Sequence, residues 1–145
     1  MFRPDIIVLG PFGKHDALSP IGWGNERPKV TYDTPPQFQE EDYFNGLREM
    51  AHALTQGSGA TLILALPVPF PSGSTEHTVA KLCLPATKRL AEDLGALTAD
   101  LFTPFAGTPG CFPDADHLDN SATDTMTEIV AQAVRAAAAK MQPKL

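Results

Sequence analysis

Three short apolar runs, far apart in the chain, constrain the fold more than any other feature of the sequence. They are rich in leucine and β-branched residues and lack the alternation of a half-exposed strand: Ile6–Leu9, Thr61–Leu66 and Leu97–Phe102. Such runs are typical of strands that are covered on both faces, as in a parallel sheet. Because parallel neighbours need a crossover connection, we expect helices between them.

Apolar residues recur at helical spacing between these runs and after the last one. The stripes span Tyr43–Leu54, Val79–Leu94 and Met126–Ala137. Gly57 and Gly95 supply stops after the first two, and Pro85 either kinks or restarts the second. Ser121 to Asp124 before the third stripe has the pattern of a capping box with Ser121 as the cap. The alternation predicts an α/β fold with a parallel sheet of about three strands.

Composition sets the class of protein. The 145 residues suffice for a single domain over 1–145, with 11 basic against 17 acidic residues and a net charge of −6. The absence of a basic block argues against nucleic-acid binding. No apolar run approaches the roughly 18 residues of a membrane span, and Met1–Asp5 does not resemble a signal peptide, so we expect a cytoplasmic protein without a membrane partner. Cys83 and Cys111 form no C-x-x-C pair, although one bridge between them stays open.

One short motif carries chemistry. In Asp114-Ala115-Asp116-His117, a carboxylate stands three residues before a histidine. That spacing can orient an imidazole as the general base for an attacking hydroxyl or water. The segments 11–36 and 67–74 are rich in proline and glycine and follow predicted strands, where open α/β sheets place their ligands.

Four blocks occur in the order found in the SGNH (GDSL-type) hydrolases. Their G-x-N-D block resembles Gly13-Lys14-His15-Asp16, which has histidine in place of asparagine. The next strand of the family and its exit resemble Leu62–Pro69, and the stretch before the last block resembles Leu90–Phe102. The last block, D-x-x-H, matches Asp114–Asn120. The resemblance covers almost all of the chain but only about the last two-thirds of a family domain. It implies a three-layer α/β/α, flavodoxin-like fold, here truncated to about three strands.

The resemblance also implies roles for residues. His117 would be the general base, Asp114 would orient its imidazole, and His15 would stand where the family's asparagine donates to the oxyanion. Asp16 completes that block, unless it only caps the loop and His15 is an exposed loop residue. The family's nucleophilic serine belongs to a block that this sequence does not contain.

The attacking atom is therefore open. Ser19, Ser72 and Ser74 fall in loops expected to face the site, and Cys111 is a more nucleophilic candidate, although a buried structural cysteine is the simpler interpretation. Water activated by His117 is a further alternative. For substrate binding, Trp23 is a candidate wall of an acyl pocket and Asn25 a candidate replacement for the missing asparagine.

The missing block has a structural consequence. In the family, the strand that bears the serine lies beside the one corresponding to Ile6–Leu9, so its absence leaves that edge bare and apolar. A bare edge invites pairing with another chain. We expect a homodimer, or a separate partner chain, joined at this strand.

Three functions are open at this point. The first is an esterase or acyl hydrolase acting on small carboxylic esters without a cofactor or metal. The second is an inactive remnant or binding module that keeps the pocket. The third is a metal-dependent hydrolase, in which side chains at the strand ends would converge as ligands: His15, Asp16, Asp114, Asp116 and His117.

Overall fold

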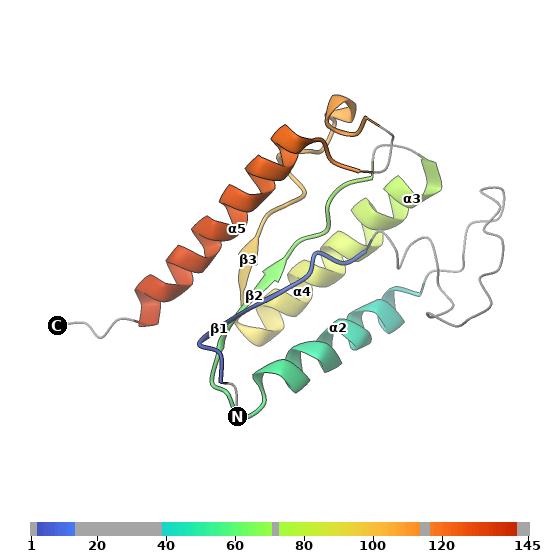
Figure 1. The fold of residues 1–145 in the computed structure, drawn as a ribbon. Helices are drawn as coiled ribbons and strands as arrows, with labels where there is room; N and C mark the ends of the chain where they lie inside the picture. Colours follow the sequence, from blue (N-terminus) through green and yellow to red (C-terminus); the bar gives the residue numbers. More distant parts are fainter. Residues whose placement is uncertain (1–2, 14–38, 71–72, 114–116, 142–145) are drawn as a thin grey trace, which may run out of the picture.

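Strands and helices alternate along the chain, as the apolar runs predict (Figure 1). The computed structural model describes residues 3–13, 39–70, 73–113 and 117–141. Its elements are β1 (Ile6–Leu9), α2 (Glu40–Thr55), β2 (Thr61–Ala65), α3 (Gly73–Thr78), the π-helix η1 (Val79–Cys83), α4 (Leu84–Leu94), β3 (Leu97–Ala99), the 3-10 helix η2 (Pro109–Cys111) and α5 (Asn120–Met141). The α/β class is confirmed.

The described strands form one parallel sheet in the order β1-β2-β3. Ile7 lies opposite Leu62, and Ile63 lies opposite Leu97. Because all three strands run the same way, their carboxyl ends meet at one edge of the sheet.

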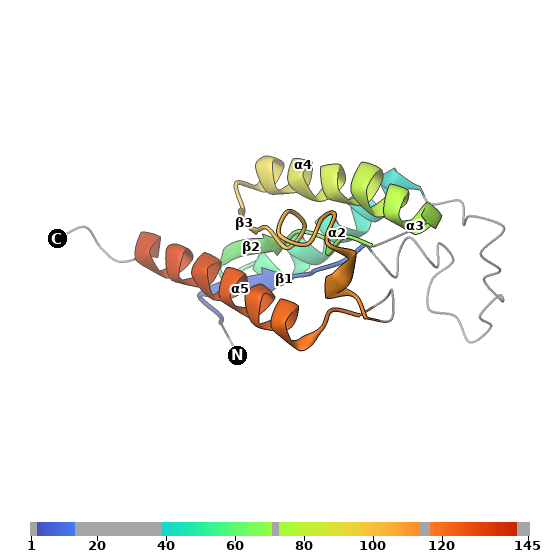
Figure 2. The same cartoon turned by 90° about the horizontal axis from the view of Figure 1, so that it is seen from above.

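Helices cover both faces of this sheet (Figure 2). Successive residues of a strand point to opposite faces, so the central strand β2 feeds two separate clusters. Leu62 and Leu64 pack against α2 and α4, whereas Ile63 and Ala65 pack against α5. The clean division explains why β2 shows no alternation of polar and apolar residues.

A buried hydrogen bond ties the two helices of one face together. Tyr43 of α2 and Thr87 of α4 have their hydroxyl oxygens 3.0 Å apart. Thr87 donates its own proton to the carbonyl of Cys83 at 2.8 Å, so Tyr43 is the donor between the two hydroxyls. Nearby, the Arg89 guanidinium lies 4.3 Å from the centre of the Phe44 ring, a cation–π contact between the same helices.

The predicted helix stops are confirmed. Gly57 and Gly95 have positive φ angles of 73° and 60°, which glycine adopts without the strain of a side chain. Pro85 lies in the first turn of α4, directly after the π-helix η1, and the backbone stays helical from α3 through η1 into α4, so the helix does not restart at the proline.

Two local predictions were wrong. β3 ends at Ala99 instead of Phe102, because the Asp100 carboxylate accepts the N–H groups of Phe102 and Thr103 and turns the chain away. The cap of α5 is Asp119, which accepts the N–H of Ala122 at 2.7 Å, and Ser121 instead donates its hydroxyl to that carboxylate.

Burial also differs from expectation at several apolar positions. Met50 and Leu54 of the first stripe are 39% and 46% exposed, since the face of α2 that packs in the core is formed by Tyr43, Phe44, Leu47 and Ala51. Val8 of β1 is 39% exposed, because α5 contacts mainly β2 and β3 on that face of the sheet. β1 is therefore not covered on both faces.

Two further features bear on the predicted class of protein. Cys83 and Cys111 are both thiols, with no disulfide between them. Within the described ranges, we find no helix with the length and apolar character needed to cross a membrane.

Candidate functional site

The carboxyl edge of the sheet gathers three segments that follow the strands. They are Gly10–Gly13 after β1, Leu66–Phe70 after β2 and the longer stretch from Asp100 to Phe112 after β3. Ligands of open α/β sheets bind at this edge. The structure therefore brings these three segments together at the carboxyl edge of the sheet.

The chain leaves β1 in close contact with β2. Gly10 has a φ of 107°, and a Cβ at this position would lie 2.8 Å from the carbonyl oxygen of Ala65. Gly13, the first residue of the block that resembles G-x-N-D, is buried against Pro67 and Cys83. Only glycine fits at Gly10 without a shift of the backbone.

A turn centred on Asp100 shapes the exit of β3. Its carboxylate accepts the backbone N–H groups of Phe102 and Thr103, each at 3.0 Å, and the Thr103 hydroxyl at 2.7 Å. Partial burial raises the pKa of Asp100, but these hydrogen bonds and the charge of Lys88 outweigh it and leave the pKa below its ordinary value. The turn holds the following residues as a compact loop.

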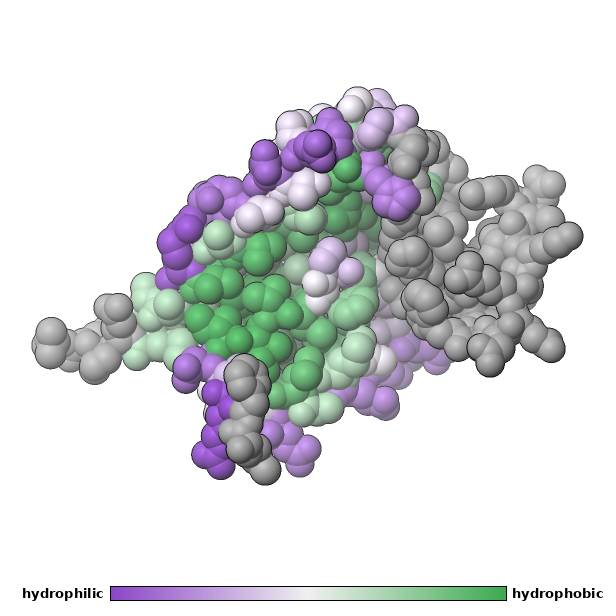
Figure 3. Space-filling model, viewed as in Figure 1, coloured by the Kyte–Doolittle hydropathy of each residue, from purple (hydrophilic) through white to green (hydrophobic). Residues whose placement is uncertain are grey.

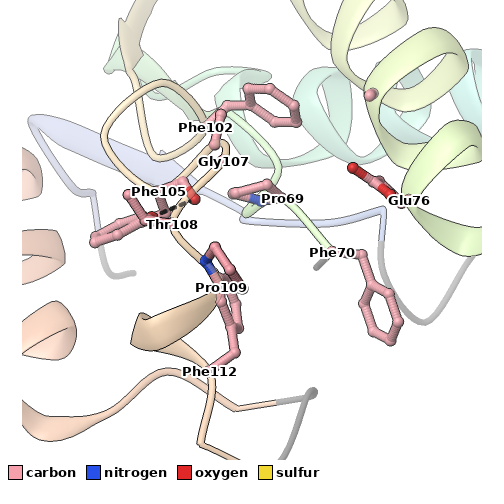
Figure 4. A pocket seen from close by; sticks show the side chains of 11 residues that line it. Pro69, Phe70, Glu76, Phe102, Phe105, Gly107, Thr108, Pro109 and Phe112 are labelled. Carbon is pink, nitrogen blue, oxygen red and sulfur yellow. Dashed lines mark hydrogen bonds between the residues drawn. The ribbon is translucent and has the colours of Figure 1, made fainter. Parts of the chain in front are cut away.

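A cavity of about 80 Å³ lies between this loop, the exit of β2 and α3 (Figure 4). That volume has room for several water molecules or one small organic group. Aromatic and small residues dominate its lining: Pro69, Phe70, Glu76, Ala80, Phe102, Phe105, Ala106, Gly107, Thr108, Pro109 and Phe112. Of these described lining residues, Glu76 is the one that carries a charge.

The segment that carries His117 begins at the wall of this cavity. The N–H of Asp119 donates to the carbonyl of Cys111 at 2.9 Å and so closes the chain between them. Leu118 and Cys111 pack against the buried Phe105 and Phe112. His117 itself is exposed and is not a lining residue of the cavity.

Asp119 fixes the start of α5 directly after His117. The N–H of Ala122 and the hydroxyl of Ser121 both donate to its carboxylate. These hydrogen bonds, that of Ala122 first, hold the pKa of Asp119 below its ordinary value. The position of the backbone next to His117 is thus set by the helix cap.

Most site residues predicted from sequence lie outside the described ranges. These are Asp114, Asp116, His15, Asp16, Trp23 and Asn25. Of the predicted site, the structure places His117 and Cys111, and it puts both on the segment between the aromatic cavity and α5. Cys111 is half-buried, between the two states that the sequence left open.

Sequence reasoning missed the cavity. Four of the eight phenylalanines line it, and each follows an element that ends at the carboxyl edge. That concentration was the signal available in the sequence. For metals, the part of the chain that the structure describes holds no group of three or more histidine, cysteine, aspartate or glutamate side chains arranged as ligands.

Comparisons with models of protein families, with curated proteins and with solved structures found no match to this chain.

Proposed function

We propose that the chain is an SGNH-like ester hydrolase that acts on small carboxylic esters, with the aromatic cavity as the binding site for part of the substrate. The observation that carries the proposal is the position of this cavity at the carboxyl edge of a parallel sheet, with Phe112 in its wall and His117 on the adjoining segment. Apolar pockets with few polar groups at this edge are the common ligand sites of α/β folds.

The proposed chemistry follows from the residue types. The imidazole of His117, held in one tautomer by Asp114, removes a proton from a hydroxyl, a thiol or water, and the resulting nucleophile attacks the ester carbonyl. His15 donates an N–H to the oxyanion. The proton then passes from the imidazole to the departing alkoxide, so the products with water as nucleophile are the acid and the alcohol. Cys111 is a second candidate nucleophile.

Hydrolysis of p-nitrophenyl acetate by the purified full chain tests this proposal. His117→Ala should lower kcat/KM by about 10²–10⁴-fold, the usual contribution of a general base. His52, exposed on α2, gives a matched control, and His52→Ala should leave the rate unchanged. Equal rates for the two variants would contradict the assignment of His117.

Covalent labelling identifies the attacking atom. A fluorophosphonate should modify a serine, whereas iodoacetamide at low concentration should modify Cys111 if the thiol is the nucleophile. Mass spectrometry then locates the adduct. Turnover without any adduct assigns the attack to water, and turnover that EDTA abolishes would favour the metal-dependent alternative.

A second candidate is a binding module that keeps the pocket and has no catalytic activity. The exposure of His117 and its absence from the cavity lining favour this alternative. A rate no higher than that of heat-denatured protein, together with ligand binding, would support it over hydrolysis.

The proposed assembly is a homodimer joined at β1. In the described chain, no strand pairs with the outer edge of β1. Figure 3 shows an apolar area over β1 and α5, and on α5 the residues Val130, Val134, Ala138 and Met141 follow one another at helical spacing without an intervening charge on that side. An uncharged open edge beside an apolar surface is a site for pairing with a second copy.

Light scattering after size-exclusion chromatography tests this assembly. Val8→Lys places a charge at the edge and should convert a dimer into a monomer. Leu54→Lys changes a residue of similar exposure on α2 and should leave the dimer intact. A monomeric wild-type chain at micromolar concentration would contradict the proposal.

A further inference from the structure

The described lining of the aromatic cavity combines apolar aromatic side chains with one negative charge. Four phenylalanines and Glu76 are among the described residues that line this cavity, and Figure 4 shows the Phe70 ring directed away from Glu76 and the Phe105 ring directed away from Pro69. Figure 4 shows the Glu76 side chain extending from α3 toward Pro69 and Phe102. Among the lining residues that the structure describes, none is a lysine, arginine or histidine.

Hydrogen-bond donors are largely consumed within the loop. The Thr108 hydroxyl donates to the carbonyl of Phe105 at 2.6 Å, so its oxygen is left to the cavity as an acceptor. The backbone N–H groups of Phe105, Ala106 and Thr108 also donate within the turn, to the carbonyls of Phe102 and Phe105. An anion would therefore meet a carboxylate, aromatic side chains and acceptors, with few donors among the described lining residues to bind it.

We infer that the cavity binds a small organic cation, specifically a quaternary ammonium group. The faces of aromatic rings are negative and attract cations, and aromatic walls are a known way to recognise quaternary ammonium ligands. A quaternary ammonium has no N–H to satisfy, so a wall of ring carbons costs it no hydrogen bond. Glu76 at the wall adds a charge of opposite sign.

The volume agrees with this ligand class. A cavity of about 80 Å³ holds a group of the size of a trimethylammonium head, not a long acyl chain. Taken with the proposed function, on which this step rests, the ammonium group would belong to the alcohol part of the ester. The preferred substrate would then be a small ester of an amino alcohol.

Direct binding to the full chain tests the cation site without reference to catalysis. Choline and 3,3-dimethylbutan-1-ol have nearly the same shape and differ in charge, so isothermal titration of each isolates the charge effect. We expect choline to bind about tenfold more tightly, as one favourable cation–π or ion-pair contribution would give. Equal affinities, or no binding of choline up to tens of millimolar, would overturn the inference.

Variants assign the preference to particular side chains. Glu76→Gln keeps the size of the residue and should reduce the preference for choline several-fold, whereas Glu92→Gln, on the exposed side of α4, should not change it. Phe102→Leu keeps an apolar wall but removes a ring face, and it should also weaken choline selectively. A preference unchanged in both cavity variants would place the cation elsewhere and refute the site.

Turnover separates this inference from the proposed function. Acetylcholine and 3,3-dimethylbutyl acetate differ in the same charge. Hydrolysis of both esters at equal kcat/KM would retain the hydrolase and remove the cation site. Selective binding of choline without hydrolysis of either ester would retain the cation site and remove the hydrolase.

Discussion

The hydroxyl pair between α2 and α4 allows a quantitative test of the fold. Thr87 is only 3% exposed and is the buried polar side chain of the described core. It accepts from Tyr43 at 3.0 Å and donates to the carbonyl of Cys83 at 2.8 Å. Tyr43→Phe removes only the donor, whereas Thr87→Val removes the acceptor and keeps the shape of the side chain.

The two substitutions should differ in cost. Tyr43→Phe loses one neutral buried hydrogen bond, about 0.5–1.5 kcal/mol. Thr87→Val should cost more, about 1–3 kcal/mol, because it removes two hydrogen bonds, the one accepted from Tyr43 and the one donated to the carbonyl of Cys83. At roughly 2.1 cal/mol/K per residue, a chain of this length has an unfolding entropy of about 0.3 kcal/mol/K, so each kcal/mol lowers Tm by about 3 °C.

Urea and thermal unfolding followed by circular dichroism measure both variants and the double variant. The cycle should give a coupling energy of about 1 kcal/mol, because the two residues share the bond. Thr125→Val is the matched control: Thr125 is exposed on α5, and its hydroxyl donates to the backbone carbonyl of Ser121. This substitution should change the unfolding free energy by less than about 0.5 kcal/mol. Additive losses in the cycle would refute the bond between the hydroxyls.

Other outcomes follow from single positions. Asp119→Ala should lower Tm more than Ser121→Ala, because the carboxylate and not the hydroxyl caps α5; the reverse order would restore Ser121 as the cap. The pKa values of Asp100 and Asp119 are lowered in the folded chain. The unfolding free energy should therefore be constant above about pH 4 and fall as the pH drops through the lowered pKa values. Urea unfolding at pH 6, 4 and 3 without such a fall would contradict this expectation. Gly10→Ala should destabilise by about 1–3 kcal/mol because of its φ and the close carbonyl, whereas Gly46→Ala, in open space within α2, should stabilise by about 0.5–1 kcal/mol; stability measurements with equal effects would disprove the close approach.

The strands and helices could be predicted because periodicity and burial agree there. β2 is buried on both faces, so its continuous apolar run had one interpretation, and the glycine after α4 is in the left-handed conformation that such stops adopt. The residues at which these elements begin and end were harder to predict. Asp100 and Asp119 each use a side-chain carboxylate to take backbone N–H groups, a competition with regular structure that periodicity does not register.

The candidate site was predictable only in part. The D-x-x-H pattern places Asp114 and His117 close in sequence, but the cavity is built from phenylalanines of separate segments that only the sheet brings together. The exposure of Val8 likewise depends on where α5 crosses the sheet, which no local pattern encodes. Long-range placement is thus what the sequence left open.

We propose that the imidazole of His117 accelerates ester hydrolysis beside the aromatic cavity. The most direct measurement is kcat/KM for p-nitrophenyl acetate in the wild-type chain, in His117→Ala and in His52→Ala, followed by the absorbance of the released p-nitrophenolate. We expect turnover in the wild-type chain and in His52→Ala, and a loss of about 10²–10⁴-fold in His117→Ala. Turnover that persists in His117→Ala, or that never exceeds the rate in buffer, would contradict it.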